Sequence, residues 1–148
     1  MAIKQVIVMR KDLKMRRGKE VAQGAHASLK IFFDRMSPLI IYEEREQDDP
    51  HYEYGTIKER VHGHFDCRMT PEMESWKEGA FTKICVKVNS EEELLEIVEK
   101  AKLAKLPVAL ICDKGLTEFD GVPTNTCCAI GPANSEEIDK ITGGLPLY

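Results

Sequence analysis

The sequence predicts an α/β fold, a three-layer domain in which helices flank a small, mixed, mostly parallel four-stranded sheet. Short β-branched runs alternate with helical patterns along the chain, which is typical of this class. A length of 148 residues, with 43% hydrophobic and 31% charged residues, suits one globular core. No apolar run approaches the roughly 20 residues of a membrane helix, so we expect a cytoplasmic protein with no membrane partner.

The first strand and the first helix follow one another directly. Residues 4–10 (KQVIVMR) alternate and are β-branched, which predicts a strand. A polar connection at 11–17 leads to a helix expected from Gly18 to Arg35. One apolar face of this helix is expected to be buried; it carries Ala22, Ala25, Leu29, Phe32 and Phe33. A narrow polar stripe lies beside that face and consists of Lys19, Gln23, His26 and Lys30.

The second strand and helix are marked by a helix start signal. Residues 82–88 (TKICVKV) predict a strand, and residues 89–104 predict a helix. Ser90 and Glu93 form a capping box at its start. The acidic residues of the first turn also suit the helix dipole.

Two further strands and a short helix complete the fold. Residues 106–112 (LPVALIC) are nearly all apolar, which predicts a central strand. After a loop at 113–121, residues 122–131 form the fourth strand. The last helix, SEEIDKI, is capped by Asn134 or Ser135.

One segment does not fit this alternation. Residues 36–70 are acidic and rich in turn-forming residues. They separate the first helix from the second strand by far more than a usual connection. We therefore predict one domain over residues 1–148 that carries 36–70 as an insertion.

Charge is distributed unevenly along the chain, whose net charge is −4. The net charge is +6 over residues 1–35, −6 over 36–82 and −4 over 83–148. An acidic protein with one basic end can still bind a polyanion there. A random distribution of surface charge is the alternative.

The five cysteines do not predict a disulfide framework, because their number is odd and no C-x-x-C pair occurs. Cys85, Cys112 and Cys128 lie in apolar runs, where a free cysteine is usually a small core residue. We expect Cys112 to point into the sheet, which argues against a thiol nucleophile.

A short histidine pattern lies in the predicted insertion. His62, His64 and Cys67 form H-x-H-x-x-C, and His51 is nearby in the sequence. These residue types can bind zinc. Their spacing matches no strong zinc signature, so we predict no metal site.

Polar residues are expected to meet at one edge of the sheet. In open α/β sheets, ligands bind outside the carboxyl ends of the strands. The start of the first helix, the loop that begins at Asp113 and the start of the fourth strand, if that strand runs antiparallel, meet at this edge. The side chains expected there are Lys19, Gln23, His26, Asp113, Thr117 and Thr126. An ordinary turn or helix-cap role for Asp113 is the alternative.

The first helix begins with an unusual concentration of positive charge, carried by Lys14, Arg16, Arg17 and Lys19. Cations at a helix start oppose the helix dipole. An anion bound by the free N–H groups of the helix start would account for these cations. The more specific hypothesis is contact with phosphate groups. A solvated helix end is the alternative. The P-loop pattern G-x-x-x-x-G-K-[ST] is absent.

Three separated motifs resemble one family. The run KQVIVMRKDLKMRRGKEVAQGAHAS (4–28) resembles the start of peptidyl-tRNA hydrolases of the archaeal and eukaryotic type, in which a basic turn precedes G-K-x-x-A-Q-x-x-H-A. LPVALICDKGLTEF (106–119) resembles the family's strand followed by D-x-G-x-T. NTCCAIGPANSEEIDKITGGLPLY (125–148) resembles its ending. The resemblance covers residues 3–35 and about 72–148.

The resemblance implies a hydrolase that cleaves the ester between a peptide and the terminal ribose of tRNA. It implies no established metal or organic cofactor, and often a homodimer. It also implies functional roles for the six edge residues. Lys19 would bind a phosphate or the developing oxyanion, and Asp113 would orient or deprotonate the attacking water.

The remaining residues receive supporting roles under the same resemblance. Thr117 and Thr126 would position the water or the ribose hydroxyl. Gln23 and His26 would act through their neighbours or contact tRNA. Backbone phosphates would be bound by Lys14, Arg16 and Arg17.

Two departures from the family pattern affect what the resemblance predicts. Cys112 and Lys114 stand where the family commonly has Gln and Ala. Lys114 would favour the ionised form of Asp113 or add a phosphate contact. The acidic insertion at 36–70 would contact a partner chain or narrow the substrate range. The alternatives are therefore a tRNA- or RNA-binding module without hydrolysis, and an esterase or amidase redirected by the insertion.

Overall fold

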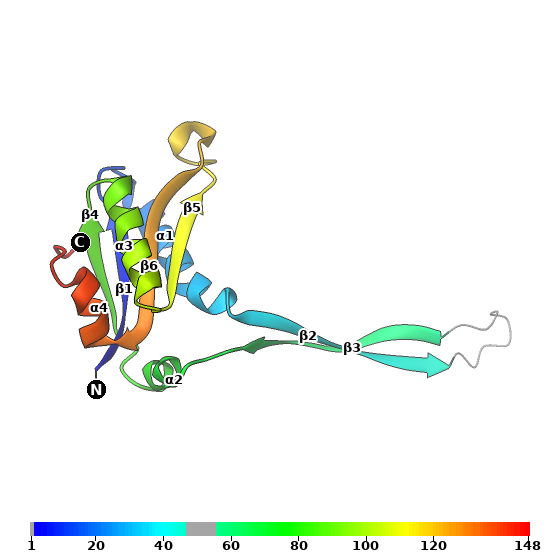
Figure 1. Cartoon of the computed structure of the whole chain (residues 1–148). Coiled ribbons are helices and arrows are strands. Elements are labelled where there is room, and N and C mark those ends of the chain that lie inside the picture. Colours follow the sequence, from blue (N-terminus) through cyan, green and yellow to red (C-terminus); the bar gives the residue numbers. More distant parts are fainter. Residues whose placement is uncertain (1, 47–55) are drawn as a thin grey trace. The chain divides into compact units, whose positions relative to one another are not determined.

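The computed structural model describes residues 2–46 and 56–148, with side chains outside 38–65. The chain forms two compact units, Met1–Asp34 with Met69–Tyr148 and Arg35–Arg68 (Figure 1). The smaller unit is a hairpin of strands β2 (Met36–Glu46) and β3 (Thr56–Cys67). The elements of the larger unit are β1 (Ile3–Arg10), α1 (Arg17–Phe33), α2 (Pro71–Glu78), β4 (Lys83–Val88), α3 (Glu91–Leu103), β5 (Val108–Asp113), the 3₁₀ turn η1 (Phe119–Gly121), β6 (Thr124–Asn134) and α4 (Ser135–Thr142).

The sheet of the larger unit has the order β4-β1-β6-β5. β1 runs parallel to β4, from Gln5 opposite Lys83 to Arg10 opposite Val88. β6 runs antiparallel to both of its neighbours, β1 and β5. Three strands therefore point the same way while β6 runs against them. This is the predicted mixed sheet, and it places the start of β6 beside the carboxyl ends of β1 and β5.

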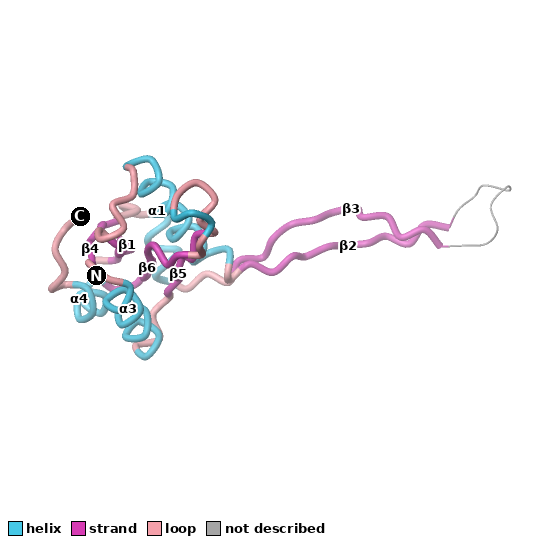
Figure 2. Tube along the Cα trace, turned by 90° about the horizontal axis from the view of Figure 1, so that it is seen from above, coloured by secondary structure: helices cyan, strands magenta, loops and turns pink. Residues whose placement is uncertain are grey.

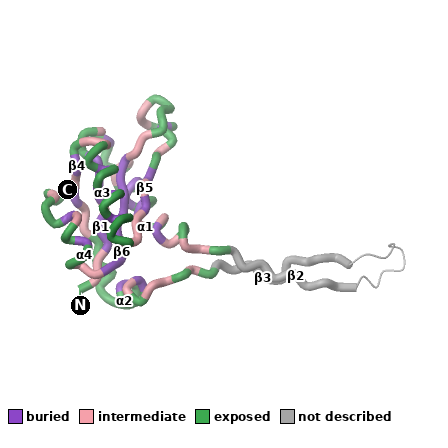
Figure 3. The backbone as a smooth tube through the Cα atoms, viewed as in Figure 1, coloured by how far each residue is buried: buried purple, intermediate pink, exposed green. Residues whose placement is uncertain are grey.

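Helices cover both faces of this sheet, which confirms the three predicted layers (Figure 2). On one face, side chains from α3 and α4, such as Leu94 and Ile138, pack with Val6 and Val8 of β1. On the other face, Ala27 of α1 packs in a cluster with Met9 and with residues of α2. The alternation of β1 thus supplies both cores. Buried residues concentrate along the strands between the helix layers (Figure 3).

The prediction that residues 106–112 form a central strand is wrong, because β5 lies at the edge of the sheet. Its apolar composition has another cause. Both α1 and α3 pack on β5, so its two faces need apolar side chains although one edge is unpaired. The central strands are β1 and β6, and residues 126–133 of β6 are all buried.

The predicted buried face of α1 is also wrong. Ala22 and Ala25 are exposed, as are Leu29 (50%) and Phe33 (56%), and Phe32 is half-buried. The buried residues are Gln23, Gly24, Ala27 and Ile31. A Cβ built on Gly24 would already touch Ile7 Cδ1 at 3.7 Å, so small residues allow the close approach of helix and sheet. The apolar pattern of the helix predicts the wrong buried face, because the polar Gln23 is buried and has hydrogen-bond partners.

Three elements between residues 36 and 78 were not predicted. The strands of the β2–β3 hairpin form most of the segment interpreted as an insertion. α2 follows and is capped by Thr70, whose hydroxyl accepts a hydrogen bond from the Met73 N–H at 3.2 Å. Thr-Pro-Glu is a helix start signal, so this helix was visible in the sequence. That 36–70 is an insertion stays a prediction.

The starts of α3 and α4 confirm the predicted caps. Ser90 Oγ accepts from the Glu93 N–H at 3.1 Å, and Asn134 Oδ1 accepts from the Glu136 N–H at 2.9 Å. Among the residues that the structure describes, no helix is long and apolar enough to cross a membrane.

Candidate active site

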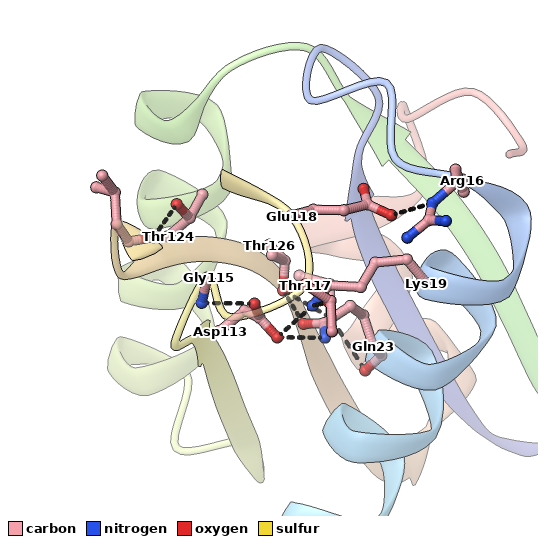
Figure 4. Close-up of polar contacts among 11 residues, drawn as sticks. Arg16, Lys19, Gln23, Asp113, Gly115, Thr117, Glu118, Thr124 and Thr126 are labelled. Carbon is pink, nitrogen blue, oxygen red and sulfur yellow. Dashed lines mark hydrogen bonds and ion pairs between the residues drawn. The ribbon is translucent and has the colours of Figure 1, made fainter. Parts of the chain in front are cut away.

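The predicted edge of the sheet brings together polar side chains from three segments. α1 contributes Lys19 and Gln23, the end of β5 contributes Asp113, and the start of β6 contributes Thr126 (Figure 4). The loop after β5 adds Thr117. Five of the six predicted edge residues are therefore joined in one hydrogen-bonded cluster. Their chemical roles stay predictions.

Lys19 and Asp113 form the centre of this cluster. The Lys19 Nζ donates to Asp113 Oδ2 at 2.8 Å and to Thr117 Oγ1 at 3.1 Å. The two charged side chains are largely withdrawn from solvent, with exposed fractions of 12% and 16%. An ammonium group has three N–H donors. Two of them are used within the described residues, so the third can bind a substrate oxygen.

Gln23 and Thr126 hold the Asp113 carboxylate through two successive hydrogen bonds. The Gln23 amide Nε2 donates to Asp113 Oδ2 at 2.9 Å, and the Thr126 hydroxyl donates to Gln23 Oε1 at 2.5 Å. Both side chains are buried, with exposed fractions of 1% and 0%. The predicted role of Thr126 in positioning the water or the ribose hydroxyl stays a prediction, and its buried hydroxyl can serve that role only through Gln23. Thr126 fixes the orientation of the Gln23 amide.

The turn after β5 holds the other carboxylate oxygen. The Gly115 N–H donates to Asp113 Oδ1 at 2.9 Å. Gly115 has φ +76°, and a Cβ there would lie 2.5 Å from the Val122 carbonyl oxygen, so glycine is required. The Gly121 N–H donates to the Gly115 carbonyl at 2.9 Å, which closes the loop.

These contacts determine the charge state of Asp113. The hydrogen bond from Lys19 is the largest cause and lowers the pKa of the carboxyl. Burial acts in the opposite direction, while the Gly115 N–H, the Lys19 charge and the Gln23 amide lower the pKa further. Asp113 is therefore ionised at neutral pH. Oδ2 accepts two hydrogen bonds and Oδ1 one from described residues, which leaves Oδ1 able to accept from a water molecule.

A pocket of about 420 Å³ opens beside the cluster. Its walls come from α1, from the end of β5 and from the following loop, and consist of Lys19, His26, Ile111, Cys112, Asp113, Lys114, Leu116 and Thr117. His26 lines the pocket and is exposed, but no hydrogen bond joins it to the five-residue cluster in the part of the chain that the structure describes.

Cys112 is exposed, so the prediction that it points into the sheet is wrong. It lies at the end of an edge strand, where the pairing of β5 with β6 shifts register between Ile111 and Cys112. Cys128 is buried as predicted, and Cys85 is half-buried. Burial raises the pKa of the Cys127 thiol to about 12 and raises that of Cys128 as well, so neither is a thiolate at neutral pH.

The cations at the start of α1 differ in whether they form an ion pair with a described residue. Arg16 is the N-cap residue, and no side chain caps this helix end. The Arg16 Nε pairs with Glu118 Oε1 at 2.8 Å, while the Arg16 side chain stays 78% exposed. Lys14 and Arg17 are exposed and make no ion pair with a described residue. Sequence analysis missed Glu118, which joins the loop to the helix start.

The zinc hypothesis rests on residues that the structure does not describe in full. The side chains of His51, His62 and His64 lie outside the described residues, and Cys67 is half-buried. Among the described residues, no group of three or more metal-ligating side chains occurs.

Comparison with known proteins gives a consistent result over the whole chain. Residues 3–148 match the family described as "Peptidyl-tRNA hydrolase PTH2". A protein named peptidyl-tRNA hydrolase from Methanopyrus kandleri is 40% identical, over 97% of this chain and 97% of its own length. Proteins of the same name from Haloquadratum walsbyi (36%, over 99% and 100%) and Methanocaldococcus jannaschii (37%, over 98% and 99%) are similar to this chain over comparable lengths.

Proposed function

This chain belongs to the peptidyl-tRNA hydrolase PTH2 family, and we propose from that membership that it hydrolyses the ester between a peptide and tRNA. The observation that carries the proposal is the extent of the match, which includes every residue of the five-residue cluster. Hydrolysis would release tRNA from peptidyl-tRNA left by aborted translation.

Lys19 is proposed to stabilise the charge that develops on the ester carbonyl. Water adds to the carbonyl carbon and the carbonyl oxygen becomes an oxyanion. The bond to the ribose oxygen then breaks as the carbonyl re-forms, and the ribose oxygen takes up the proton that the water gave to Asp113. The unused N–H of Lys19 supplies a fixed positive donor for that oxyanion. Such donors favour the transition state because they need no reorganisation during the reaction.

Asp113 is proposed to orient the attacking water through Oδ1. Its lowered pKa makes it a weak base, so it accepts a proton only as the bond between water and carbonyl carbon forms. Thr117 accepts from Lys19, which leaves its own hydroxyl hydrogen free to bind a ribose oxygen. Gln23 and Thr126 are positioning residues for Asp113.

The helix start is proposed to bind tRNA phosphates. Lys14 and Arg17 are exposed cations, and the uncapped N–H groups of α1 add partial positive charge. Arg16 uses Nε for Glu118, so its terminal N–H groups stay available for a phosphate. His26 would contact tRNA from the pocket wall.

Three further properties belong to this proposal. The reaction is proposed to need no metal ion, the protein to act in the cytoplasm, and the chain to form a homodimer. For the dimer, the described surface offers an apolar stripe on α1, where Val21 (69%), Leu29 (50%) and Phe33 (56%) are exposed. Introducing a charge with Leu29→Glu would shift a dimer of this kind to monomer in light scattering.

The test is cleavage of N-acetyl-aminoacyl-tRNA by the wild type and by Asp113→Asn, with EDTA in a parallel reaction. We expect cleavage by the wild type that survives EDTA and collapses in the variant. Loss of wild-type cleavage in the reaction with EDTA would contradict the proposal that no metal ion is needed. No cleavage by the wild type, with salt-sensitive tRNA binding retained, would contradict the hydrolase and favour an RNA-binding module.

A further inference from the structure

One cation of the pocket is not used by the catalytic cluster. Lys114 lines the pocket and is exposed. It has no hydrogen bond or ion pair with any residue that the structure describes. Lys19, the other lysine of the pocket, is by contrast bound to Asp113 and Thr117. A cation without a partner in a pocket is available to an anionic ligand.

We infer that this pocket is the subsite for the 3′-terminal nucleotide of tRNA, with Lys114 bound to the 5′-phosphodiester of that nucleotide. The inference rests on the proposed ester hydrolysis, because it takes Asp113 and Lys19 as the place where the ester bond breaks.

The backbone fixes the position of Lys114 relative to Asp113. On one side, Asp113 is the last residue of β5 and is held by Lys19 and Gln23. On the other side, Gly115 is held by Asp113 Oδ1 and by the Gly121 N–H. Lys114 thus occupies a turn that is hydrogen-bonded on both sides. These hydrogen bonds fix the backbone of Lys114 directly after Asp113, at the wall of the pocket.

The charge state of Asp113 is explained without Lys114. The largest causes that lower the pKa of Asp113 are its contacts with Lys19, Gly115 and Gln23. Of the two roles that the sequence leaves open for Lys114, this supports a ligand contact. An ammonium binds phosphate oxygens through short charge-assisted hydrogen bonds.

The geometry of a nucleotide fits this arrangement. Within one nucleotide, only the ribose ring separates the esterified 2′- or 3′-oxygen from the 5′-phosphate. Lys114 directly follows Asp113 and lines the same pocket, so the inference places the 5′-phosphate within reach of its side chain when the ester is at Asp113 and Lys19. Leu116 is 84% exposed at the same pocket and offers an apolar surface for the base.

The phosphate can be tested apart from the rest of tRNA. The two probes are the N-acetyl-leucyl ester of adenosine and the same ester of adenosine 5′-monophosphate, which differ only in the phosphate. We expect the wild type to show a kcat/KM about tenfold higher for the phosphorylated probe. Lys114→Ala is expected to lower this ratio to about one while keeping the rate on the adenosine ester, and Lys114→Arg is expected to restore the preference.

A matched control separates the site from general surface charge. Lys102 is an exposed lysine of α3 that pairs with Glu99. Lys102→Ala has the same change of net charge and is expected to keep the tenfold ratio. With N-acetyl-leucyl-tRNA, Lys114→Ala is expected to raise KM with little change in kcat. It should also reduce the slope of log(kcat/KM) against log[salt] by about 0.7.

The outcomes distinguish this inference from the proposed function. Hydrolysis of both probes with an unchanged ratio in Lys114→Ala overturns the inference and leaves the hydrolase intact. An equal loss of rate on both probes in Lys114→Ala also overturns it, because Lys114 would then act on the reaction rather than on the phosphate. If the wild type cleaves neither small ester, the inference is tested on N-acetyl-leucyl-tRNA alone. An unchanged KM and an unchanged salt slope in Lys114→Ala then overturn it. Failure to cleave the tRNA ester contradicts the proposed function itself.

Discussion

The two long helices of the larger unit, α1 and α3, pack on the same sheet and are built in opposite ways. α3 has a side-chain cap at Ser90, glutamates in its first turn, lysines in its last turn and a buried face of apolar residues only. α1 has no side-chain cap, cations at its start and a buried face that includes Gln23 and Gly24. Local rules of helix stability account for α3 but not for α1.

The difference lies in what each helix needs from the rest of the fold. α3 satisfies its end groups with its own residues. α1 depends on the end of β5, which supplies Asp113 to Lys19, and on the loop after it, which supplies Glu118 to Arg16. Residues that weaken a helix locally are retained where a distant segment gives them a function. α1, the end of β5 and the loop after it are therefore joined by side-chain contacts, and we propose that they act as one functional unit, whereas α3 supports the fold.

The largest expected effect is the loss of activity when Lys19 is removed. Lys19→Ala is expected to lower kcat/KM for N-acetyl-aminoacyl-tRNA by about 100- to 1,000-fold, because the oxyanion loses its fixed cation. Steady-state kinetics measures this, with Lys102→Ala on α3 as the matched control. An effect below about threefold for Lys19→Ala would remove the functional distinction between the two helices.

A smaller effect is expected from Thr126, which acts through Gln23. Thr126→Val leaves the buried Gln23 Oε1 without its donor, which costs about 1–3 kcal/mol of unfolding free energy. A misplaced Asp113 also lowers kcat, by up to about 100-fold. Thr126→Ser keeps the hydroxyl and is expected to restore kcat. Thermal unfolding and kinetics of both variants check this, and a Thr126→Val enzyme with normal kcat would contradict the positioning role.

The acid dependence of stability offers a further comparison. The pKa of Asp113 is lowered in the folded protein, so the stabilisation from its carboxylate is complete above the unfolded value of about 3.8 and is lost as pH falls through the folded value. The difference in unfolding free energy between the wild type and Asp113→Asn is therefore expected to be constant from pH 7 to about 5 and to shrink in stronger acid. Urea unfolding over that range measures it. A difference that already shrinks between pH 7 and 5 would contradict the lowered pKa.

The smallest effect is expected on the side of α3. Ser90→Ala removes the cap that accepts from the Glu93 N–H and is expected to cost about 1 kcal/mol. This corresponds to a fall in Tm of about 3 °C, while kcat/KM stays within about twofold. Thermal unfolding and the ester assay check both halves, and a larger loss of activity than of stability would show that α3 also serves the site.

The same comparison explains which parts of the structure were predictable. The caps of α3 and α4 depend on residues adjacent in sequence, so the predictions were correct. The edge position of β5 and the buried face of α1 depend on strand order and on partners about 90 to 100 residues away, which local periodicity does not contain. Gln23 illustrates this, because polarity assigns it to the surface and two distant hydrogen bonds bury it.

The candidate site was more predictable than the packing around it. The position of Asp113 after an apolar strand, together with the rule that ligands bind at carboxyl ends of strands, was enough to collect five of the six edge residues. The buried role of Thr126 was not predictable, since an alternating strand does not reveal which neighbour a hydroxyl will meet. Glu118 was missed because its partner, Arg16, was assigned to phosphate alone.

The claim that α1 and the end of β5 act as one unit is tested most directly by a double-mutant cycle on Lys19 and Asp113. Single-turnover rates of ester cleavage are measured for Lys19→Ala, Asp113→Ala and the double variant. If the two residues act together, the double variant is expected to be no slower than the slower single variant. Independent effects that multiply in the double variant would contradict the claim.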